Sequence, residues 1–369
     1  MPKVLVIGGG FAGLSAVREL RRHGIKLEVS LIDGKENSEF LPLLPDVIGR
    51  GVESKYLCYP IKDLSLKYDF YHINGQVLEL FPDENKAAYS YGMLYYDYLL
   101  LAGGSETAFY SKENLKESAF RLDNVEDAEK IKAAVGAGEY SSYVVAGGGY
   151  TGIEIATNIR LLLKKTGNAG RVVVVEKAEK ILGQLPEWMK KYAGRNLSKM
   201  GIEVITDASV EDFTGSTVTL SDSSVFKEAM LIWSAGVKTP EFVQKLNVAK
   251  GKQGRIMVDE HLRFAEGAFA AGDTAEFRTN KGPIRMAVQF SLAEGRLAAR
   301  NIIRAIEGRP LLKYRPVDLG FILPMANNSS CGTVLGLDVT GPIATFLHYL
   351  MCLYRLTGME NKLALLNRK

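Results

Sequence analysis

The chain has 369 residues, of which 47% are hydrophobic and 24% charged, a balance typical of globular proteins and not of disordered ones. The net charge is only +4, and the lysines and arginines are scattered singly or in pairs, which argues against a nucleic-acid partner. The three cysteines and four histidines are far apart in sequence, so we expect reduced thiols and no bound metal.

The first predicted element is an apolar strand that begins at Lys3 and leads directly into a glycine-rich turn and a helical pattern. The residues of this turn are Gly8, Gly10, Phe11, Ala12 and Gly13. The first glycine permits a tight turn, the second lets the backbone approach a pyrophosphate, and the third lets the helix pack closely on the strand. An apolar run that ends this early does not fit a signal peptide, so we expect a cytoplasmic protein.

The strand that follows this helix ends at Asp33. Dinucleotide-binding folds carry an acid for the adenosine ribose about 20 residues or slightly more after the turn, and Asp33 occupies that position. A polar segment then leads to a third apolar strand, which places Ala102 and Gly103 at its carboxyl end. We expect Val77 to belong to the same nucleotide site.

The same order of features repeats in the middle of the chain. The second turn contains Gly147, Gly149, Tyr150, Thr151 and Gly152, the next strand ends at Glu176, and a later strand ends at Ala235 and Gly236. One such turn often occurs by chance, but two turns with matching acids indicate two copies of a dinucleotide-binding unit. Chemistry that requires two dinucleotides is hydride transfer from a nicotinamide to a flavin. A carboxylate at Glu176 repels a 2′-phosphate, which favours NADH over NADPH.

A third feature is the apolar strand that ends in Gly272 and Asp273. The Asp273 carboxylate can accept hydrogen bonds from the ribityl hydroxyls of a flavin, and we expect the next helix to point at the flavin's pyrophosphate. Gly-Asp after a strand is common by itself. Its position after two glycine-rich turns makes it a candidate flavin-binding segment.

In this order, the two turns, their acids and the Gly272-Asp273 segment resemble the flavoprotein superfamily with two dinucleotide-binding domains that includes glutathione reductase. The resemblance covers nearly the whole chain. It implies an α/β fold of two Rossmann-like domains, the second inserted in the first. Residues 1–108 and 237–325 then form a discontinuous FAD-binding domain, residues 109–236 the NADH-binding domain, and residues 326–369 a C-terminal region that associates with a membrane.

Two further segments resemble type II NADH:quinone oxidoreductases. Residues 40–45 are similar to the Phe-x-Pro-Leu-Leu-Pro signature that these enzymes share with sulfide:quinone oxidoreductases, and the second turn continues to Glu154 as in the NADH enzymes. The chain lacks both the Cys-x4-Cys motif of disulfide reductases and the usual central cysteine of the sulfide enzymes. The resemblance therefore implies FAD-dependent electron transfer from NADH to a quinone, without proton pumping.

Two alternatives remain open for the activity. The first is a sulfide:quinone oxidoreductase-like enzyme that works through Cys331, or a soluble NADH-dependent flavoprotein reductase with another acceptor. The second is a redox sensor that binds flavin and NADH, although no feature of the sequence positively suggests it.

The resemblance also implies roles for two residues. Glu154 stands near a helix start, where the helix dipole favours any acid, and the resemblance places its carboxylate close to the flavin and the nicotinamide, where it orients substrate or assists proton delivery. The family's quinone-site motif corresponds to residues 288–295, in which Gln289 and Gly295 match and Val288, Ser291, Ala293 and Glu294 differ. Gln289 is thus either a quinone-site residue or an ordinary polar residue at a helix start.

The C-terminal part of the chain predicts a small sheet over the flavin pocket and then an amphipathic helix. Its apolar positions are Ile343, Phe346, Leu347, Leu350, Met351 and Tyr354. This stretch is too short to cross a membrane. It either packs on the protein's own core or on a second subunit, or it lies in a membrane interface.

In the membrane arrangement, Tyr349 and Tyr354 lie at headgroup level and the basic residues Arg355, Lys362, Arg368 and Lys369 face anionic lipid. The resemblance favours this arrangement, on the inner face of the cell membrane. The sequence leaves open whether the chain forms a homodimer.

Overall fold

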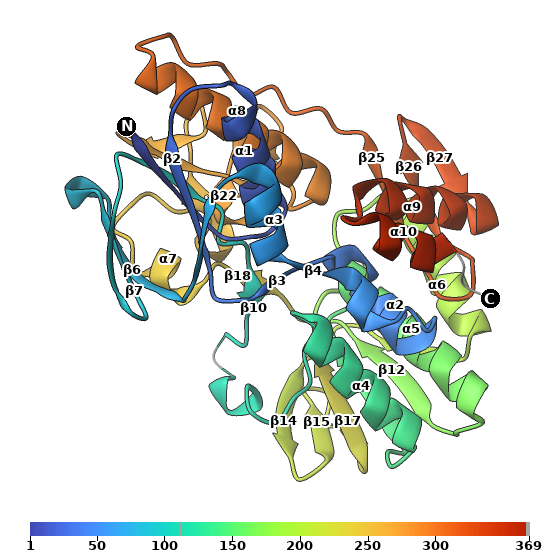
Figure 1. Ribbon diagram of the computed structural model, residues 1–369. Coiled ribbons are helices and arrows are strands. Elements are labelled where there is room, and N and C mark those ends of the chain that lie inside the picture. The colour runs from blue at the N-terminus through green and yellow to red at the C-terminus, as the bar shows by residue number, and fades with distance from the viewer. Residues whose placement is uncertain (111, 367–369) are drawn as a thin grey trace. The chain divides into compact units, whose positions relative to one another are not determined.

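The computed structural model describes residues 1–110 and 112–366, which fall into two compact units (Figure 1). Unit 1 comprises Met1–Ser38, Tyr59–Glu106 and Lys238–Asp318, and unit 2 comprises Glu39–Cys58, Thr107–Val237 and Leu319–Lys369. This division differs from the predicted domains, because unit 2 also contains residues 39–58, 107–108, 237 and 319–325 of the predicted FAD-binding domain, together with the predicted C-terminal region.

Unit 1 is built on a six-stranded sheet with the strand order β20-β21-β9-β1-β2-β5. Its strands are β1 (Lys3–Ile7), β2 (Glu28–Asp33), β5 (Tyr71–Asn74), β9 (Tyr98–Leu101), β20 (Arg263–Ala265) and β21 (Ala268–Ala270). In the central strands Val6 pairs with Leu31 on one side and with Leu100 on the other, both in parallel. All strands of this sheet except β20 run parallel. Strand β21 pairs with β9, so a segment far along the chain completes the sheet that begins at Lys3.

The two faces of this sheet carry different layers because successive side chains of a strand point in opposite directions. Val4 and Val6 pack against helices α1 (Phe11–Arg22), α3 (Ile61–Tyr68) and α8 (Val288–Ile306). Leu5 and Ile7 pack on the opposite face, where an antiparallel sheet contributes buried residues. This second layer is formed by β6 (Val77–Phe81), β7 (Lys86–Tyr89) and β8 (Gly92–Tyr95).

Unit 2 repeats this plan on a four-stranded parallel sheet with the order β13-β12-β11-β17. The strands are β11 (Ser142–Ala146), β12 (Arg171–Val175), β13 (Ile202–Ile205) and β17 (Ala229–Trp233). Val145 and Val174 pack against α4 (Val125–Ala137), α5 (Tyr150–Thr166) and α6 (Glu187–Lys199). Val144 and Val173 pack against the antiparallel sheet of β14 (Val210–Thr214), β15 (Thr217–Leu220) and β16 (Val225–Phe226). The repeat expected from the sequence is therefore present in the fold.

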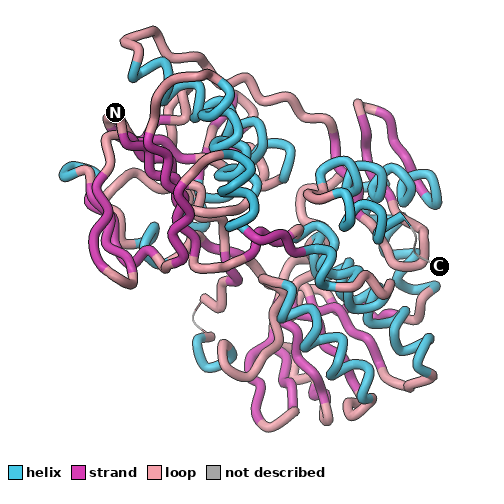
Figure 2. Tube along the Cα trace, in the orientation of Figure 1, coloured by secondary structure: helices cyan, strands magenta, loops and turns pink. Residues whose placement is uncertain are grey.

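The C-terminal part of unit 2 forms an antiparallel sheet followed by helices, as its pattern predicts (Figure 2). These elements are β25 (Gly320–Leu323), β26 (Cys331–Val334), β27 (Leu337–Thr340), α9 (Gly341–Arg355) and α10 (Met359–Leu366). Unit 2 also contains α2 (Leu44–Gly49), which begins within the Phe-Leu-Pro-Leu-Leu-Pro segment of residues 40–45. Three single helical turns belong to the same unit, η1 (Leu41–Leu43), η2 (Ser54–Leu57) and η4 (Glu113–Leu115).

The remaining elements are short. Unit 1 contains α7 (Glu241–Gln244), η3 (Pro82–Glu84), η5 (Lys252–Gly254), η6 (Gly272–Thr274) and the strand pairs β19 (Ile256–Met257) with β22 (Ala275–Glu276) and β23 (Arg278–Thr279) with β24 (Gly282–Pro283). Four more strands, β3 (Asn37–Glu39), β4 (Cys58–Pro60), β10 (Glu106–Thr107) and β18 (Val237–Lys238), lie where the chain passes between the units.

Candidate functional sites in the two units

The first glycine-rich turn joins β1 to α1 at the carboxyl edge of the unit 1 sheet. Gly8 has a φ of +107°, and a Cβ there would lie 2.2 Å from the carbonyl oxygen of Ala102. A Cβ at Gly13 would lie 1.9 Å from the carbonyl oxygen of Gly8. At Gly10, which caps α1, no heavy atom lies within 4 Å of the Cβ position. The turn is thus closely packed on its inner side and open where the helix N-terminus begins.

The second turn, between β11 and α5 of unit 2, has the same geometry. Gly147 has a φ of +106°, and a Cβ there would lie 2.6 Å from the carbonyl oxygen of Ser234. A Cβ at Gly152 would lie 1.9 Å from the carbonyl oxygen of Gly147, and the Cβ position at Gly149 has no heavy atom within 4 Å. Each unit therefore presents an open helix N-terminus, where backbone N–H groups and the helix dipole favour a phosphate.

The acids predicted to bind ribose contact these turns directly. Asp33 accepts a hydrogen bond from the Gly9 N–H at 2.6 Å, and Glu176 accepts one from the Gly148 N–H at 2.7 Å. The second oxygen of each carboxylate accepts from the amide two residues further along the chain, at 2.8 and 2.9 Å. Since a carboxylate has about four acceptor positions, both side chains retain capacity for ribose hydroxyls.

The predicted residues at the helix starts occupy matching positions in the two units, since Phe11 and Ala12 begin α1 and Tyr150 and Thr151 begin α5. The predicted match of Ala102 and Gly103 with Ala235 and Gly236 is wrong by one residue. Ala102 and Gly103 face Gly8 in the way that Ser234 and Ala235 face Gly147, because β17 ends at Trp233 where β9 ends at Leu101. Val77 is buried at the start of β6. At Gly236, which has a φ of +149°, a Cβ would lie 2.2 Å from the Tyr110 hydroxyl.

The Gly272-Asp273 segment lies beside the first turn of α1. Gly272 has a φ of +73°, and a Cβ there would lie 3.2 Å from the Cβ of Ala12. Asp273 is partly exposed and accepts a hydrogen bond from the Ser105 hydroxyl at 3.0 Å. Burial raises the pKa of Asp273, which the bond from Ser105 opposes.

The next long helix after Asp273 is α8, which starts only at Val288. Residues 272–274 form a single 3₁₀ turn, and the three short strands β22, β23 and β24 lie between it and α8. That α8 points at the flavin's pyrophosphate stays a prediction, whereas the N-terminus of α1 lies beside Gly272.

Gln289 lies in the first turn of α8, within unit 1. Its side-chain amide donates a hydrogen bond to Asp318 at 3.1 Å, and Arg285 binds the same carboxylate. The side chain therefore has a structural partner. Whether it also contacts a quinone stays a prediction.

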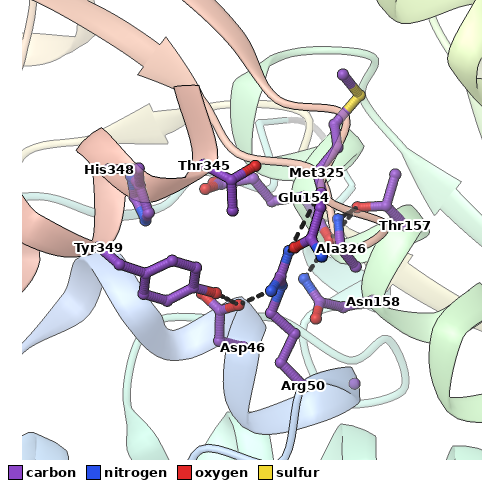
Figure 3. A network of polar contacts seen from close by, with 12 residues as sticks. Asp46, Arg50, Glu154, Thr157, Asn158, Met325, Ala326, Thr345, His348 and Tyr349 are labelled. Carbon is purple, nitrogen blue, oxygen red and sulfur yellow. Dashed lines mark hydrogen bonds and ion pairs between the residues drawn. The ribbon is translucent and has the colours of Figure 1, made fainter. Parts of the chain in front are cut away.

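Glu154 lies in a buried polar network of unit 2 (Figure 3). The Tyr349 hydroxyl of α9 donates to Asp46 of α2 at 2.5 Å, and the Arg50 guanidinium lies 3.2 Å from the same Asp46 oxygen. Arg50 also donates to the carbonyl oxygen of Met325 at 3.1 Å. Residues of α2, α5, α9 and the loop after β25 thus meet in this network.

The electrostatics of the network favour neutral forms. Glu154 is only 7% exposed, and burial together with the nearby Asp46 raises the pKa of Glu154 well above its ordinary value. Burial, Arg50 and Arg355 lower the pKa of His348 to about 4. The network therefore favours the protonated form of Glu154, and His348 is expected to be uncharged at neutral pH.

The family model of the pyridine nucleotide-disulphide oxidoreductases matches residues 2–295 of this chain. The chain belongs to this family. The description of the family as enzymes that use a pyridine nucleotide agrees with the two sites described above. Each unit has one open helix N-terminus and one carboxylate at a strand end.

Several relatives within the family resemble the chain along nearly its full length. The demethylphylloquinone reductase NdbB of Synechocystis sp. is 28% identical over 98% of this chain and 94% of its own. The type II NADH:quinone oxidoreductase of Staphylococcus haemolyticus is 26% identical over 94% of this chain and 92% of its own. The fold resembles that of NDH2 from Plasmodium falciparum, solved with NADH, with a TM-score of 0.86 at 15% identity over 99% of this chain and 96% of that one.

Three residues of the polar network around Glu154 were not predicted from the sequence to lie there. Asp46 follows directly after the Phe-Leu-Pro-Leu-Leu-Pro segment, so its position in a recognised motif was the available signal. Arg50 lies one helical turn after Asp46, at the C-cap of α2. Tyr349 was assigned to a membrane interface. The assignment of Tyr349 is wrong, because its hydroxyl binds Asp46 inside unit 2.

Helix α9 exposes its apolar face and buries part of its polar face. Phe346 is 66% exposed and Tyr354 is 80% exposed, whereas Thr345 and Cys352 are buried. Packing of the apolar face on the core of unit 2 is therefore excluded. Arg368 and Lys369, which were predicted to face lipid, lie outside the described residues. None of the described helices combines the length and apolar composition needed to cross a bilayer.

Proposed function

We propose that this chain is an FAD-dependent oxidoreductase that transfers electrons from NADH to a quinone. The observation that carries the proposal is the doubled nucleotide site, with the same glycine geometry and the same carboxylate bond in both units. Two dinucleotide sites in one chain suit a flavin and a nicotinamide. The names of the relatives, among them type II NADH:quinone oxidoreductase, agree with this reading.

Unit 1 is the proposed FAD site. The N-terminus of α1 receives the pyrophosphate, Asp33 the adenosine ribose, and Asp273 the ribityl hydroxyls. Unit 2 is the proposed NADH site, where the N-terminus of α5 and Glu176 have the corresponding roles. When bound, the flavin would accept a hydride from NADH and pass electrons to the second substrate.

Glu154 is the proposed proton donor. Reduction of a quinone to a quinol by NADH consumes one proton in addition to the transferred hydride. Burial and Asp46 raise the pKa of Glu154 well above its ordinary value, which suits a group that donates this proton. The quinone site itself is assigned to the region of Gln289.

The sulfide-oxidising alternative requires a reactive cysteine. Cys331 is buried, and burial raises the pKa of its thiol to about 12. Burial likewise raises the pKa of Cys352. Thiols that stay protonated are poor nucleophiles, so Cys331 and Cys352 fit this chemistry poorly.

The chain is proposed to act at the inner face of the cell membrane, attached through α9. Five apolar side chains of this helix point away from unit 2: Ile343, Phe346, Leu350, Met351 and Tyr354. Such an exposed face suits the boundary region of a bilayer. A homodimer that covers the same face is the competing arrangement.

Anaerobic addition of NADH to the purified protein tests the function. We expect NADH to bleach the flavin absorbance and a soluble quinone to restore it rapidly. If NADH leaves the flavin oxidised while sulfide bleaches it, the sulfide-oxidising activity replaces the proposed one. If NADH bleaches the flavin and quinone does not restore it, the acceptor has been assigned wrongly.

A further inference from the structure

The turn that carries Asp273 is hydrogen-bonded to a buried glutamate of α8. Glu294 of α8 is only 1% exposed, and its Oε2 accepts a hydrogen bond from the Gly272 N–H at 2.7 Å. Next to it, a Cβ at Gly295 would lie 2.1 Å from the carbonyl oxygen of Ala12. Glu294 thus binds the Gly272-Asp273 turn, which lies beside the first turn of α1, and its neighbour Gly295 packs against that same helical turn.

The second oxygen of this carboxyl, Oε1, is buried and has no hydrogen-bond partner in the described part of the chain. The hydroxyl of Tyr314, which approaches from the segment after α8, is likewise buried and unpaired among the described residues. Proximity to Glu294 contributes to the raised pKa of Tyr314, although burial is the main cause. An ionised carboxylate with an unpaired buried oxygen is unfavourable, whereas a neutral acid is tolerated.

The charged groups around Glu294 do not offset the burial of its carboxyl group. Asp273 faces it from the turn, and Arg255, the nearby cation, also interacts with Asp273 and Glu276. Burial raises the pKa of Glu294 to about 8, and Asp273 contributes, although the Gly272 amide and Arg255 oppose the shift. Glu294 is thus predominantly protonated at neutral pH.

The protonation state of Glu294 affects the FAD site because Glu294 binds the turn that lies beside the N-terminus of α1. A negative charge against the first turn of α1 would oppose the positive potential that this helix end offers to a pyrophosphate. A neutral acid leaves that potential intact and still accepts the Gly272 amide. The family's motif has glutamine at this position, which is neutral at every pH.

We propose that Glu294 is a positioning residue of the FAD site that works as a neutral carboxylic acid, so that FAD binding weakens when it loses its proton. The inference rests on the proposed FAD site in unit 1. It predicts that FAD and a proton on Glu294 bind together, each favouring the other.

The dissociation constant of FAD for the full-length apoprotein, measured by flavin fluorescence at pH 7 and pH 9, tests the inference. If one group must hold its proton, the affinity falls by up to tenfold for each pH unit above the pKa of that group, so we expect binding about tenfold weaker at pH 9. In Glu294→Gln the amide remains neutral and can still accept from Gly272, so the dissociation constant should hardly change between the two pH values.

Glu19→Gln is the matched control. Glu19 is also buried in unit 1, but Arg300 contacts it at 2.6 Å. Burial opposes ionisation of Glu19, yet the bonds to Arg300 and His23 leave its pKa lowered, so it stays ionised from pH 7 to pH 9. This variant should keep the tenfold pH effect of the wild type.

Proton uptake on FAD binding by the wild type gives a second measurement that needs no folded variant. At pH 9 about one proton should be taken up for each FAD bound, and at pH 7 almost none. Equal affinity at both pH values in the wild type, or a tenfold effect that persists in Glu294→Gln, overturns the inference. If the wild type binds no FAD even at pH 7, the proposed cofactor fails; the assay uses neither NADH nor quinone.

Discussion

The carboxylates of Asp33 and Glu176 have a structural role, because each one accepts a hydrogen bond from an amide of its own glycine-rich turn. A residue at this position therefore shapes the turn, and the same group is the one proposed to bind the ribose. The bond to the turn gives a structural reason for an acid at the end of the second strand in both units. Removing the carboxylate should affect the turn and, under the proposed function, the specificity for the nucleotide.

Glu176→Ala should raise the KM for NADH and reduce the preference for NADH over NADPH. The preference should fall because a carboxylate at this position repels the 2′-phosphate, and we expect the ratio of kcat/KM values to fall by about tenfold or more. Steady-state kinetics with both nucleotides gives the ratio. An unchanged ratio would place the source of specificity elsewhere in unit 2.

Asp46→Asn tests the environment of Glu154. Asp46 helps to raise the pKa of Glu154, so its neutralisation should lower that pKa. If Glu154 donates a proton during quinone reduction, the alkaline limb of the kcat profile moves to lower pH. In the variant the amide oxygen can still accept from Tyr349 and Arg50, but it carries no charge, so these contacts weaken and the free energy of unfolding should fall by about 1 kcal/mol.

Asp338→Asn is the control for the Asp46 prediction. Asp338 is an exposed acid on β27 of the same unit, with a hydrogen bond from Thr333. Its loss changes the net charge of the chain by the same amount without touching the network. A pH profile of Asp46→Asn that coincides with that of Asp338→Asn would contradict a role of Asp46 in tuning Glu154.

Helix α9 joins two surfaces at the scale of a secondary-structure element. One side carries Tyr349, which binds Asp46, and Cys352, whose sulfur lies 3.6 Å from the His348 ring. The opposite side presents Phe346 and Leu350 away from unit 2. The helix is thus held by its polar contacts, which leaves the apolar side for another partner.

The double variant Phe346→Ser/Leu350→Ser should bind lipid vesicles at least about tenfold more weakly than the wild type, because two side chains no longer enter the bilayer boundary. Co-sedimentation with vesicles of anionic lipid measures the binding. Leu66→Ser/Tyr71→Ser is the matched control, since both side chains are exposed on unit 1. Equal binding of all three proteins would exclude α9 as an anchor, and a change in oligomeric state on gel filtration would indicate a dimer interface.

The whole molecule is assembled from segments that alternate between the two units. β21 completes the unit 1 sheet by pairing Phe269 with Leu100, across the entire inserted part of the chain. The insertion is possible because a parallel sheet accepts a new strand at its edge from any distance in sequence. Neither unit is therefore a continuous stretch that a single cut could release.

The sequence by itself determined both nucleotide-binding turns, their acids and the family, because these depend on local requirements. A glycine at Gly8 or Gly147 is enforced by positive φ and by a carbonyl oxygen in the place of a Cβ. An apolar strand before the turn and an acid after the next strand repeat at fixed spacing, which a reader of the chain can recognise. The amphipathic pattern of α9 was equally local.

Only the tertiary structure decided which side chains meet. Asp46 and Tyr349 are 303 positions apart, and no periodicity relates them. The direction of α9 was also undetermined, because an amphipathic pattern defines two faces and does not say which one is covered. Glu294 was just a departure from a motif until the fold placed it under Gly272, where burial, neighbouring charge and an unpaired oxygen together decide its protonation.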